Sequence, residues 1–213
     1  MNKIRFFIIL AIITLASAIY YSISNLSITP PSADQLKDGD VIFQTSTSDQ
    51  SQAIQLATES RYSHCGIIFK EKDQWFVFEA SNVVKKTPLN EWIQHGVDHK
   101  YVVKRLKNAE QVLNKEALEK MKSVSLHFAK RPYDSHFEWS DEKIYCSELV
   151  WKIYHEALGI ELGQLRKLKD FNLDHPKVQA IMKQRYHENI PFNEPVIAPS
   201  DIFDCDQLET VSN

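Results

Sequence analysis

Glycine is scarce in this chain, and several common functional classes are excluded by what the sequence lacks. Only five of its 213 residues are glycine, and no glycine-rich loop that could cradle a phosphate is present. The formal net charge of −3 gives no electrostatic basis for binding nucleic acid. Internal repeats and low-complexity tracts are also missing. We therefore expect one globular domain, with 43% hydrophobic residues to fill its core.

The histidines show no pattern typical of metal binding. All eight are scattered, and none falls in an HExxH motif or in the Cys/His spacing of zinc sites. We predict neither a metal site nor a cofactor. The histidines other than His64 are interpreted as surface or local structural residues.

The first thirty residues differ in kind from the rest. Lys3 and Arg5 precede an apolar run over residues 6–21, and Ala16-Ser17-Ala18 fits the small-residue pattern of a signal-peptidase site. Extended to residue 23, the run is also close to the minimum length of a membrane span, so an uncleaved anchor is the alternative. Both interpretations of residues 1–23 predict export to the periplasm or another extracytoplasmic space. Membrane association through residues 6–23 stays open, and residues 24–35 are predicted to be a linker into the domain 36–213.

Three cysteines in an exported chain leave at least one unpaired thiol, which in an oxidising compartment invites a functional explanation. Cys146 stands at the first turn of a strongly patterned helix, where the helix dipole and free N–H groups favour a thiolate. For Cys65 we favour a buried, inert thiol. For Cys205 the sequence does not decide.

The elements read from the sequence predict an α+β domain, a small antiparallel sheet packed against helices. Strands are expected at residues 41–44, 64–69, 75–80 and 99–106, and helices at 48–60, 114–130, 146–158 and 175–188. Gly159 is expected to end the third helix. Residues 193–203 are expected to contain an edge strand.

The hairpin of residues 64–80 predicts a specific geometry. A turn centred between Glu71 and Lys72 would place His64 directly opposite Glu79, with Cβ atoms about 5 Å apart. The two side chains would then share one face of the sheet, and Cys65 would point to the other. We therefore expect Cys65 to lie away from the site; if it instead neared Cys146, a disulfide would mask that thiol.

Together these residues form a Cys–His–acid set, the general form of an activated thiol nucleophile. Cys146 would attack an acyl carbon, His64 would accept and return the proton, and Glu79 would orient the imidazole. Backbone N–H groups at the start of the Cys146 helix would hold the oxyanion. Tyr145, Ser147 and Tyr133 are further candidates for contacts with the oxyanion or substrate. Taken singly, each member of the set is more typical of a core or surface residue.

Five sequence blocks in one order carry a family resemblance. They are GDVIFQ, SHCGIIF, FEAS, PYD followed by YCSELVWKIY, and VIAPSDIF, and the resemblance runs from about Leu36 to Phe203. Together they resemble the YaeF/YiiX-type permuted papain-like amidases, within the superfamily of NlpC-type hydrolases and lecithin:retinol acyltransferase-like enzymes. The resemblance implies a papain-like fold whose circular permutation puts His64 before Cys146. It also implies that Cys146 is the nucleophile and Glu79 the acid; Cys65 departs from the small aliphatic residue that is more usual there.

The expected function is that of an exported thiol hydrolase cleaving an amide bond, in peptidoglycan peptides or N-acylated compounds. A lipid esterase or acyltransferase would use the same acyl-enzyme and differ in the bond or the acceptor. A non-catalytic lipid- or peptide-binding domain is the third alternative, although binding alone would not need all three residues. The expected partner is a cell-envelope substrate.

Overall fold

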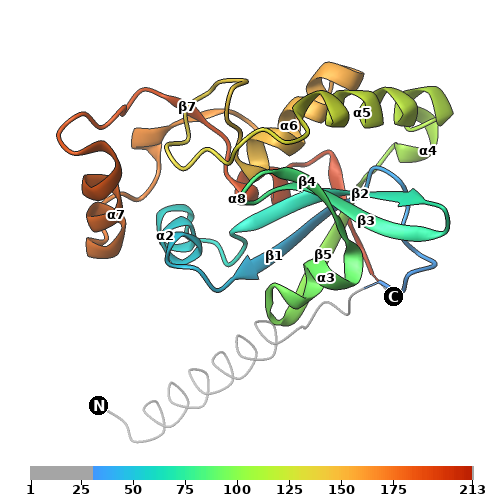
Figure 1. Cartoon of the computed structure of the whole chain (residues 1–213), viewed down its shortest axis with the longest axis horizontal. Helices are drawn as coiled ribbons and strands as arrows, with labels where there is room; N and C mark the ends of the chain where they lie inside the picture. The colour runs from blue at the N-terminus through green and yellow to red at the C-terminus, as the bar shows by residue number, and fades with distance from the viewer. Residues whose placement is uncertain (1–30, 213) are drawn as a thin grey trace, which may run out of the picture.

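The computed structural model describes residues 31–212 (Figure 1). The predicted signal peptide or anchor, and the linker up to residue 30, lie outside this range. The rest of the predicted linker packs on the domain, since the Tyr101 hydroxyl donates to the Pro31 carbonyl at 3.2 Å and the Trp75 indole N–H donates to the Ala33 carbonyl at 3.0 Å. No helix within the described range has the length and apolar character needed to cross a membrane.

Strands dominate the first half of the described range and helices the second. The strands are β1 (Val41–Ser46), β2 (His64–Glu71), β3 (Gln74–Ala80), β4 (Val84–Pro88), β5 (Gly96–Leu106), β6 (Arg166–Lys167), β7 (Pro195–Val196) and β8 (Leu208–Val211). The helices are α2 (Asp49–Thr58), α3 (Leu89–Gln94), α4 (Ala109–Val112), α5 (Lys115–Phe128), α6 (Cys146–Leu158), α7 (Pro176–Tyr186) and α8 (Pro199–Phe203), with one 3-10 turn at Leu168–Asp170.

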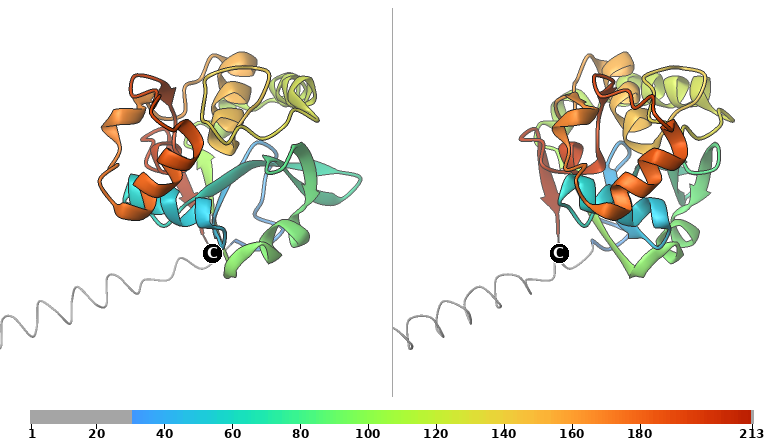
Figure 2. Two further views of the ribbon diagram at one scale, coloured as in Figure 1. Left: turned by 60° about the vertical axis from the view of Figure 1, so that its left-hand side comes forward. Right: turned by 90° about the vertical axis from the view of Figure 1, so that its left-hand side faces the viewer.

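A six-stranded antiparallel sheet in the order β4-β3-β2-β1-β5-β8 forms the centre of the domain. Helix α6 packs on β2 and β3 and carries α5 on its outer side, while α3 packs against β3, β4 and β5. Figure 1 shows α5 and α6 on one side of the sheet and α3 on the other. The views in Figure 2 show α2 and α7 side by side, beyond one end of the central strands. The predicted α+β class is confirmed.

The alternation of apolar residues along β2 and β3 explains why helices cover both faces. Cys65, Ile67 and Phe78 belong to the large core cluster that includes α6. Ile68 and Val77 belong to a smaller cluster on the other face, with Trp92 of α3. Since side chains alternate along a strand, one apolar set meets each helical layer.

The predicted register of the β2–β3 hairpin is wrong by two residues. Lys72 and Asp73 both adopt positive φ, 46° and 63°, and form a two-residue turn flanked by the pair Glu71 and Gln74. Such paired positive-φ turns match the twist of hairpin strands. A shift of two residues keeps every side chain on its predicted face, because the side-chain period of a strand is two.

The edge strand expected within residues 193–203 is present but short. Pro195–Val196 forms β7, which pairs with β6 in a two-stranded ladder separate from the central sheet. Pro199 instead starts helix α8, a position that suits proline because its missing N–H has no partner there. The edges of the central sheet are β4 and β8.

Candidate active site

Cys146 is the first residue of helix α6, as the sequence predicts. The helix runs to Leu158 and ends at Gly159, which takes the left-handed conformation at φ 68°. The first N–H groups of a helix lack partners within it, so the sulfur of Cys146 sits beside free donors and the positive end of the helix dipole. Its side chain is almost fully buried, at 2% exposure, and contributes to the wall of a pocket.

His64 and Glu79 form a hydrogen-bonded pair, although they are not directly opposite in the ladder. His64 Nε2 and Glu79 Oε2 are 2.6 Å apart. The same carboxylate accepts hydrogen bonds from the Thr87 hydroxyl at 2.6 Å and from the Trp92 indole N–H at 3.0 Å. The Trp92 ring also stacks beside the imidazole, with centroids 5.8 Å apart. Three side chains, from β3, β4 and α3, therefore fix the imidazole in one orientation.

The electrostatics favour a thiolate–imidazolium pair. Burial opposes a charge on His64, but the neighbouring Cys146 sulfur, together with the hydrogen bond to and the charge of Glu79, raises its pKa to about 10. The neighbouring Cys65 thiol, followed by the contribution of His64, overcomes burial and holds the pKa of Cys146 well below its usual range. Glu79 keeps a lowered pKa, because its bonds to His64 and Thr87 outweigh its burial. These shifts favour the charged form of all three groups: the Cys146 thiolate, the His64 imidazolium and the Glu79 carboxylate.

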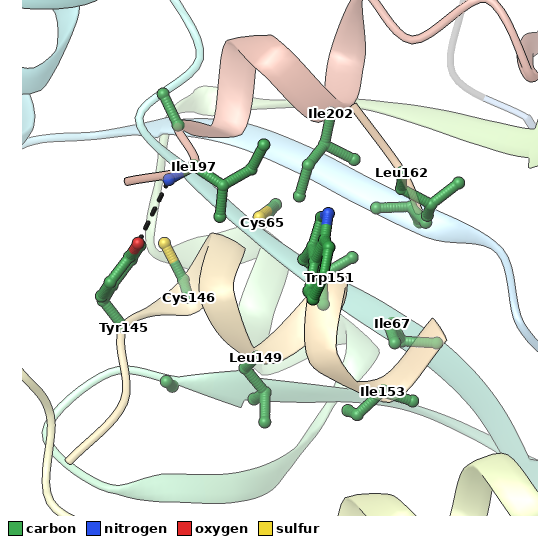
Figure 3. Close-up of a cluster of buried hydrophobic side chains, with 14 of the residues drawn as sticks. Cys65, Ile67, Tyr145, Cys146, Leu149, Trp151, Ile153, Leu162, Ile197 and Ile202 are labelled. Carbon is green, nitrogen blue, oxygen red and sulfur yellow. Dashed lines mark hydrogen bonds between the residues drawn. The ribbon is translucent and has the colours of Figure 1, made fainter. Parts of the chain in front are cut away.

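Cys65 lies beside Cys146, and the expectation that it points away from the site is wrong. Figure 3 shows the two sulfur atoms near each other at the start of α6. Cys65 lies on the sheet face that strand alternation predicts, but helix α6 covers that same face. His64, the first residue of β2, approaches Cys146 from the end of the strand. Alternation along one strand cannot tell which face a distant helix will cover. The described cysteines are all free thiols.

Tyr133 is fixed near Cys146 by a chain of polar contacts that sequence reasoning did not find. The Gln50 amide N–H donates to the Tyr133 hydroxyl at 2.7 Å, and Arg185 donates to the Gln50 amide oxygen at 2.7 Å. Because the Tyr133 oxygen accepts from Gln50, its own proton is free to donate elsewhere. Burial and the charge of Cys146 raise the pKa of Tyr133 well above its usual value, so the hydroxyl keeps that proton.

Tyr145 and Ser147, the other two predicted contacts, are tied to the segment after β7. The Ser147 hydroxyl donates to the Ile197 carbonyl at 2.8 Å, and the Ile197 N–H donates to the Tyr145 hydroxyl at 3.2 Å. Both side chains are buried. The Ser147 proton is therefore engaged in holding α6 to this segment, while the Tyr145 hydroxyl keeps its own proton free.

An apolar pocket opens on the Cys146 side of the site. It encloses about 740 Å³, its open mouth included, and α2, α7 and the segments around them line it. The apolar lining includes Ala53, Ala57, Phe171, Val178, Ile181 and Met182. Apolar walls of this kind suit the apolar part of a small ligand.

A polar groove opens on the His64 side. Its lining includes Gln44, Ser48, Ser63, Lys85 and His95. Gln50, Ile54 and Tyr133 line both this groove and the apolar pocket, so the two spaces meet at Tyr133. No local sequence pattern predicts either space, because residues distant in the chain form both.

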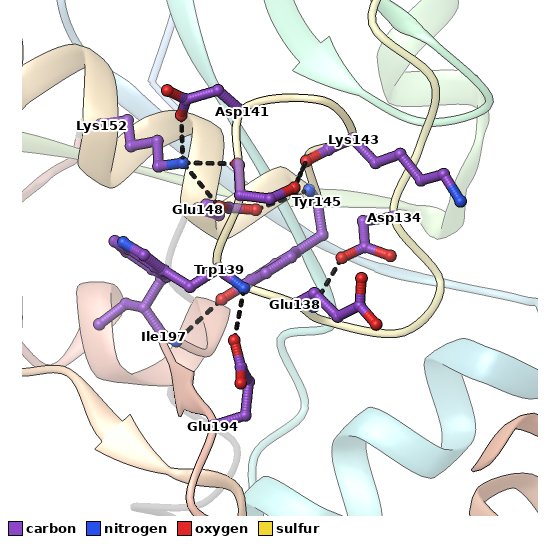
Figure 4. Close-up of polar contacts among 11 residues, drawn as sticks. Asp134, Glu138, Trp139, Asp141, Lys143, Tyr145, Glu148, Lys152, Glu194 and Ile197 are labelled. Atoms are coloured by element: carbon purple, nitrogen blue, oxygen red, sulfur yellow. Dashed lines mark hydrogen bonds and ion pairs between the residues drawn. The ribbon is translucent and has the colours of Figure 1, made fainter. Parts of the chain in front are cut away.

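The loop that carries Tyr133 into the site is anchored on α6 (Figure 4). Lys152 bonds the Glu148 carboxylate at 2.9 Å, the Asp141 carboxylate at 2.7 Å and the Ser140 carbonyl at 2.6 Å. Glu148 is fully buried and also accepts from the Tyr145 N–H at 3.3 Å. This buried ion pair holds the end of the loop at the first turn of the helix.

Comparison with known proteins agrees with this arrangement. Residues 35–212 match a family described as "Permuted papain-like amidase enzyme, YaeF/YiiX, C92 family". The chain is 46% identical over 190 residues to "Uncharacterized protein YiiX" of Escherichia coli K12, covering 89% of this chain and 93% of that protein. The crystal structure of a protein described as metalloprotein yiiX, from Escherichia coli O157:H7, is 47% identical and superposes with a TM-score of 0.80, covering 84% of this chain and 98% of that one.

The description of that relative as a metalloprotein has no counterpart in the described part of this chain. Within residues 31–212, no group of three or more His, Cys, Asp or Glu side chains is arranged to hold a metal ion. The fold, the order of the motifs and the match over nearly the whole described range lead to one conclusion. The chain belongs to the permuted papain-like amidase family of the YaeF/YiiX type, a family of cysteine hydrolases.

Proposed function

We propose that this protein is an exported thiol hydrolase that cleaves the amide bond of an N-acylated compound through an acyl-enzyme on Cys146. One observation carries the proposal: Cys146 and His64 lie where an apolar pocket meets a polar groove. The apolar acyl group would occupy the pocket beside Cys146. The polar amine portion would lie in the groove beside His64, the residue that must protonate it.

The roles of the Cys–His–Glu triad follow from this placement. The Cys146 thiolate attacks the acyl carbon, and the carbonyl oxygen becomes an oxyanion held by N–H groups at the start of α6 and by the Tyr133 hydroxyl. The C–N bond breaks as the His64 imidazolium gives its proton to the leaving amine. His64 then takes a proton from water, which hydrolyses the thioester and frees the acid. Glu79 keeps the imidazole oriented in both steps.

Gln50 and Arg185 act as positioning residues in this account. Arg185 holds the amide oxygen of Gln50, so the amide nitrogen faces Tyr133 and the tyrosine proton is directed away from it. Pre-oriented donors stabilise an oxyanion without reorganisation during the reaction.

The apolar pocket also supports a second candidate, a lipid esterase or acyltransferase with the same acyl-enzyme. The two candidates differ in the bond cleaved and in the acceptor, water or an alcohol. A peptidoglycan peptide fits less well, because the space beside Cys146 is apolar and such peptides are polar. Export and the cell-envelope location of the substrate rest on the N-terminal sequence.

The test uses the purified full-length chain with amides of one fluorogenic amine that carry acetyl, octanoyl or myristoyl groups, beside the matching esters. We expect hydrolysis that increases with acyl length, an acyl adduct on Cys146 by mass spectrometry, and no turnover in Cys146→Ala. Ala57→Phe, which fills the pocket, should lower turnover of the long-chain amides and spare the acetyl amide. Faster cleavage of the esters, or transfer to an added alcohol, would favour the second candidate. The binding-domain alternative predicts no adduct with any compound.

A further inference from the structure

Cys65 is a buried thiol to which the proposed mechanism assigns no chemical step. It lies on β2 directly after His64, and it faces the core that α6 covers. Its exposed fraction is 0%, and it lines neither the apolar pocket nor the polar groove. The sulfur of Cys146 lies beside it (Figure 3).

The two thiols differ in whether a reagent from outside can reach them. Cys146 lines the apolar pocket, so a small reagent can reach its sulfur from outside. Cys65 is fully buried and lines neither space. Cys205, the third thiol, follows α8 and lies near Gln207. An oxidant that enters the pocket therefore meets Cys146 first and finds Cys65 as the neighbouring thiol.

We propose that Cys65 and Cys146 form a site of reversible oxidation, at which a hydroperoxide converts the two thiols into a disulfide and Cys65 thereby protects the nucleophile. The inference rests on the activated Cys146 of the proposed function, but it concerns a different reaction.

The chemistry balances with a hydroperoxide as the oxidant. The Cys146 thiolate attacks the terminal peroxide oxygen, the O–O bond breaks, and the sulfur becomes a sulfenic acid while the leaving oxygen takes a proton to give water or an alcohol. Cys65 sulfur then attacks the Cys146 sulfur, the S–O bond breaks, and the hydroxide leaves as water with the proton of the Cys65 thiol. Two thiols lose two electrons, and one hydroperoxide gains them. A dithiol reductant reverses the product by thiol–disulfide exchange.

The charges around the two thiols explain why Cys146 reacts first and Cys65 second. A thiolate at Cys146 is the reactive form toward peroxide, and its lowered pKa supplies it at neutral pH. Burial and the neighbouring Cys146 charge raise the pKa of Cys65 well above its usual value, so Cys65 stays a protonated thiol while Cys146 is reduced. Conversion of Cys146 to the neutral sulfenic acid removes that charge. A resolving thiol next to a low-pKa thiol is a recurring arrangement of redox-sensitive cysteines.

To test this, the reduced full-length chain is treated with a few equivalents of hydrogen peroxide in buffer that contains a chelator. Remaining thiols are then blocked with N-ethylmaleimide, and the peptides are mapped by mass spectrometry without reduction. Wild type should yield the linked Cys65–Cys146 peptides, with iodoacetamide labelling of Cys146 lost and then restored by dithiothreitol. Cys65→Ser and Cys65→Ala should instead carry Cys146 to sulfinic acid, which dithiothreitol does not restore. Cys205→Ser should behave as wild type.

The two proposals fail in different ways. Slow reaction of Cys146 with both iodoacetamide and peroxide would overturn the activated thiol and with it both proposals. Fast iodoacetamide labelling with sulfinic acid formed equally in wild type and Cys65→Ala would overturn the oxidation site alone. A disulfide to Cys205 in place of Cys65 would overturn it as well.

Discussion

The Glu79 carboxylate reaches His64 diagonally across the β2–β3 ladder, at 2.6 Å, because the strand position beside Glu79 is Gly66. Ile67 pairs with Phe78, so Glu79, the next residue of β3, lies opposite Gly66, which has no side chain. A Cβ atom at Gly66 would lie 3.4 Å from the Glu79 Cβ. The glycine therefore leaves the carboxylate free to turn toward the imidazole.

We predict that Gly66→Ala damages both the fold and the site. The added Cβ would lie 2.5 Å from Val77 Cγ1 and 2.8 Å from the Phe78 carbonyl oxygen, so β3 must move. Overpacking of this kind costs about 1–3 kcal/mol. The free energy of unfolding, from urea titration, measures the first effect, and the iodoacetamide rate of Cys146 measures the second. Gly159→Ala at the end of α6 is the control, because the positive φ there makes alanine destabilising while nothing near it touches His64; it should lower the free energy of unfolding and leave the rate unchanged. An unchanged rate in Gly66→Ala would contradict the positioning role.

Glu79→Gln should slow the alkylation of Cys146 at neutral pH. The substitution removes the negative charge that helps to raise the pKa of His64, so the imidazolium and the thiolate are both less favoured. Each pKa unit by which the thiolate–imidazolium pair is weakened corresponds to about 1.4 kcal/mol, a factor of about ten in the equilibrium between the charged and the neutral pair. Thr87→Val removes a donor to the same carboxylate but keeps the charge, and it should have a smaller effect. Equal rates in wild type and Glu79→Gln would show that the carboxylate does not act on His64.

Gln50→Leu should lower the turnover number and leave the alkylation of Cys146 unchanged. The leucine has a similar size but cannot bond Tyr133, so the hydroxyl loses its orientation. Loss of one oxyanion donor lowers kcat by about 10²–10³-fold, and loss of the donor's orientation should lower kcat by no more than that. Steady-state kinetics with the best acyl amide, beside Tyr133→Phe, measures the effect. A higher KM at constant kcat would assign Gln50 to substrate binding instead.

The buried ion pair at the start of α6 predicts a pH dependence of stability. Burial raises the pKa of Glu148 to about 7 despite its contact with Lys152. Between the unfolded pKa near 4.3 and about 7, the folded state binds more protons at this group, so its contribution to stability falls as the pH rises. Urea midpoints of wild type and Glu148→Gln, compared across this range, isolate the contribution. A difference that stays constant or changes in the opposite direction would contradict the assignment.

Motif spacing and strand alternation predicted much of this site, and the failures have physical causes. The helix beginning at Cys146, the stop at Gly159 and the shared face of His64 and Glu79 depend on local sequence, and the structure confirms them. The hairpin register depends on which two residues of a polar tip adopt positive φ, and Lys72 and Asp73 give no clear signal.

Features formed by segments that are distant in the chain could not be predicted from the sequence. The position of Cys65 depends on which face of the sheet α6 covers, and that is decided by packing of the whole chain. The apolar pocket depends on α7 and on the segment after β7, whose places in space no local pattern gives. The contact between Gln50 and Arg185 joins residues 135 positions apart.

The pH profile of iodoacetamide labelling at Cys146 tests the central claim most directly, with the full-length chain, His64→Ala and the control His95→Ala. His64, with a pKa raised to about 10, stays protonated below that pH, while the lowered pKa of Cys146 keeps its sulfur ionised. We predict a fast rate that is flat between about pH 6.5 and 8.5 in wild type and His95→Ala, because both charges persist over this range. In His64→Ala the rate should be slower and rise with pH, as for an ordinary thiol of pKa about 8.5. A slow rate that rises with pH in all three proteins would contradict the activated thiol.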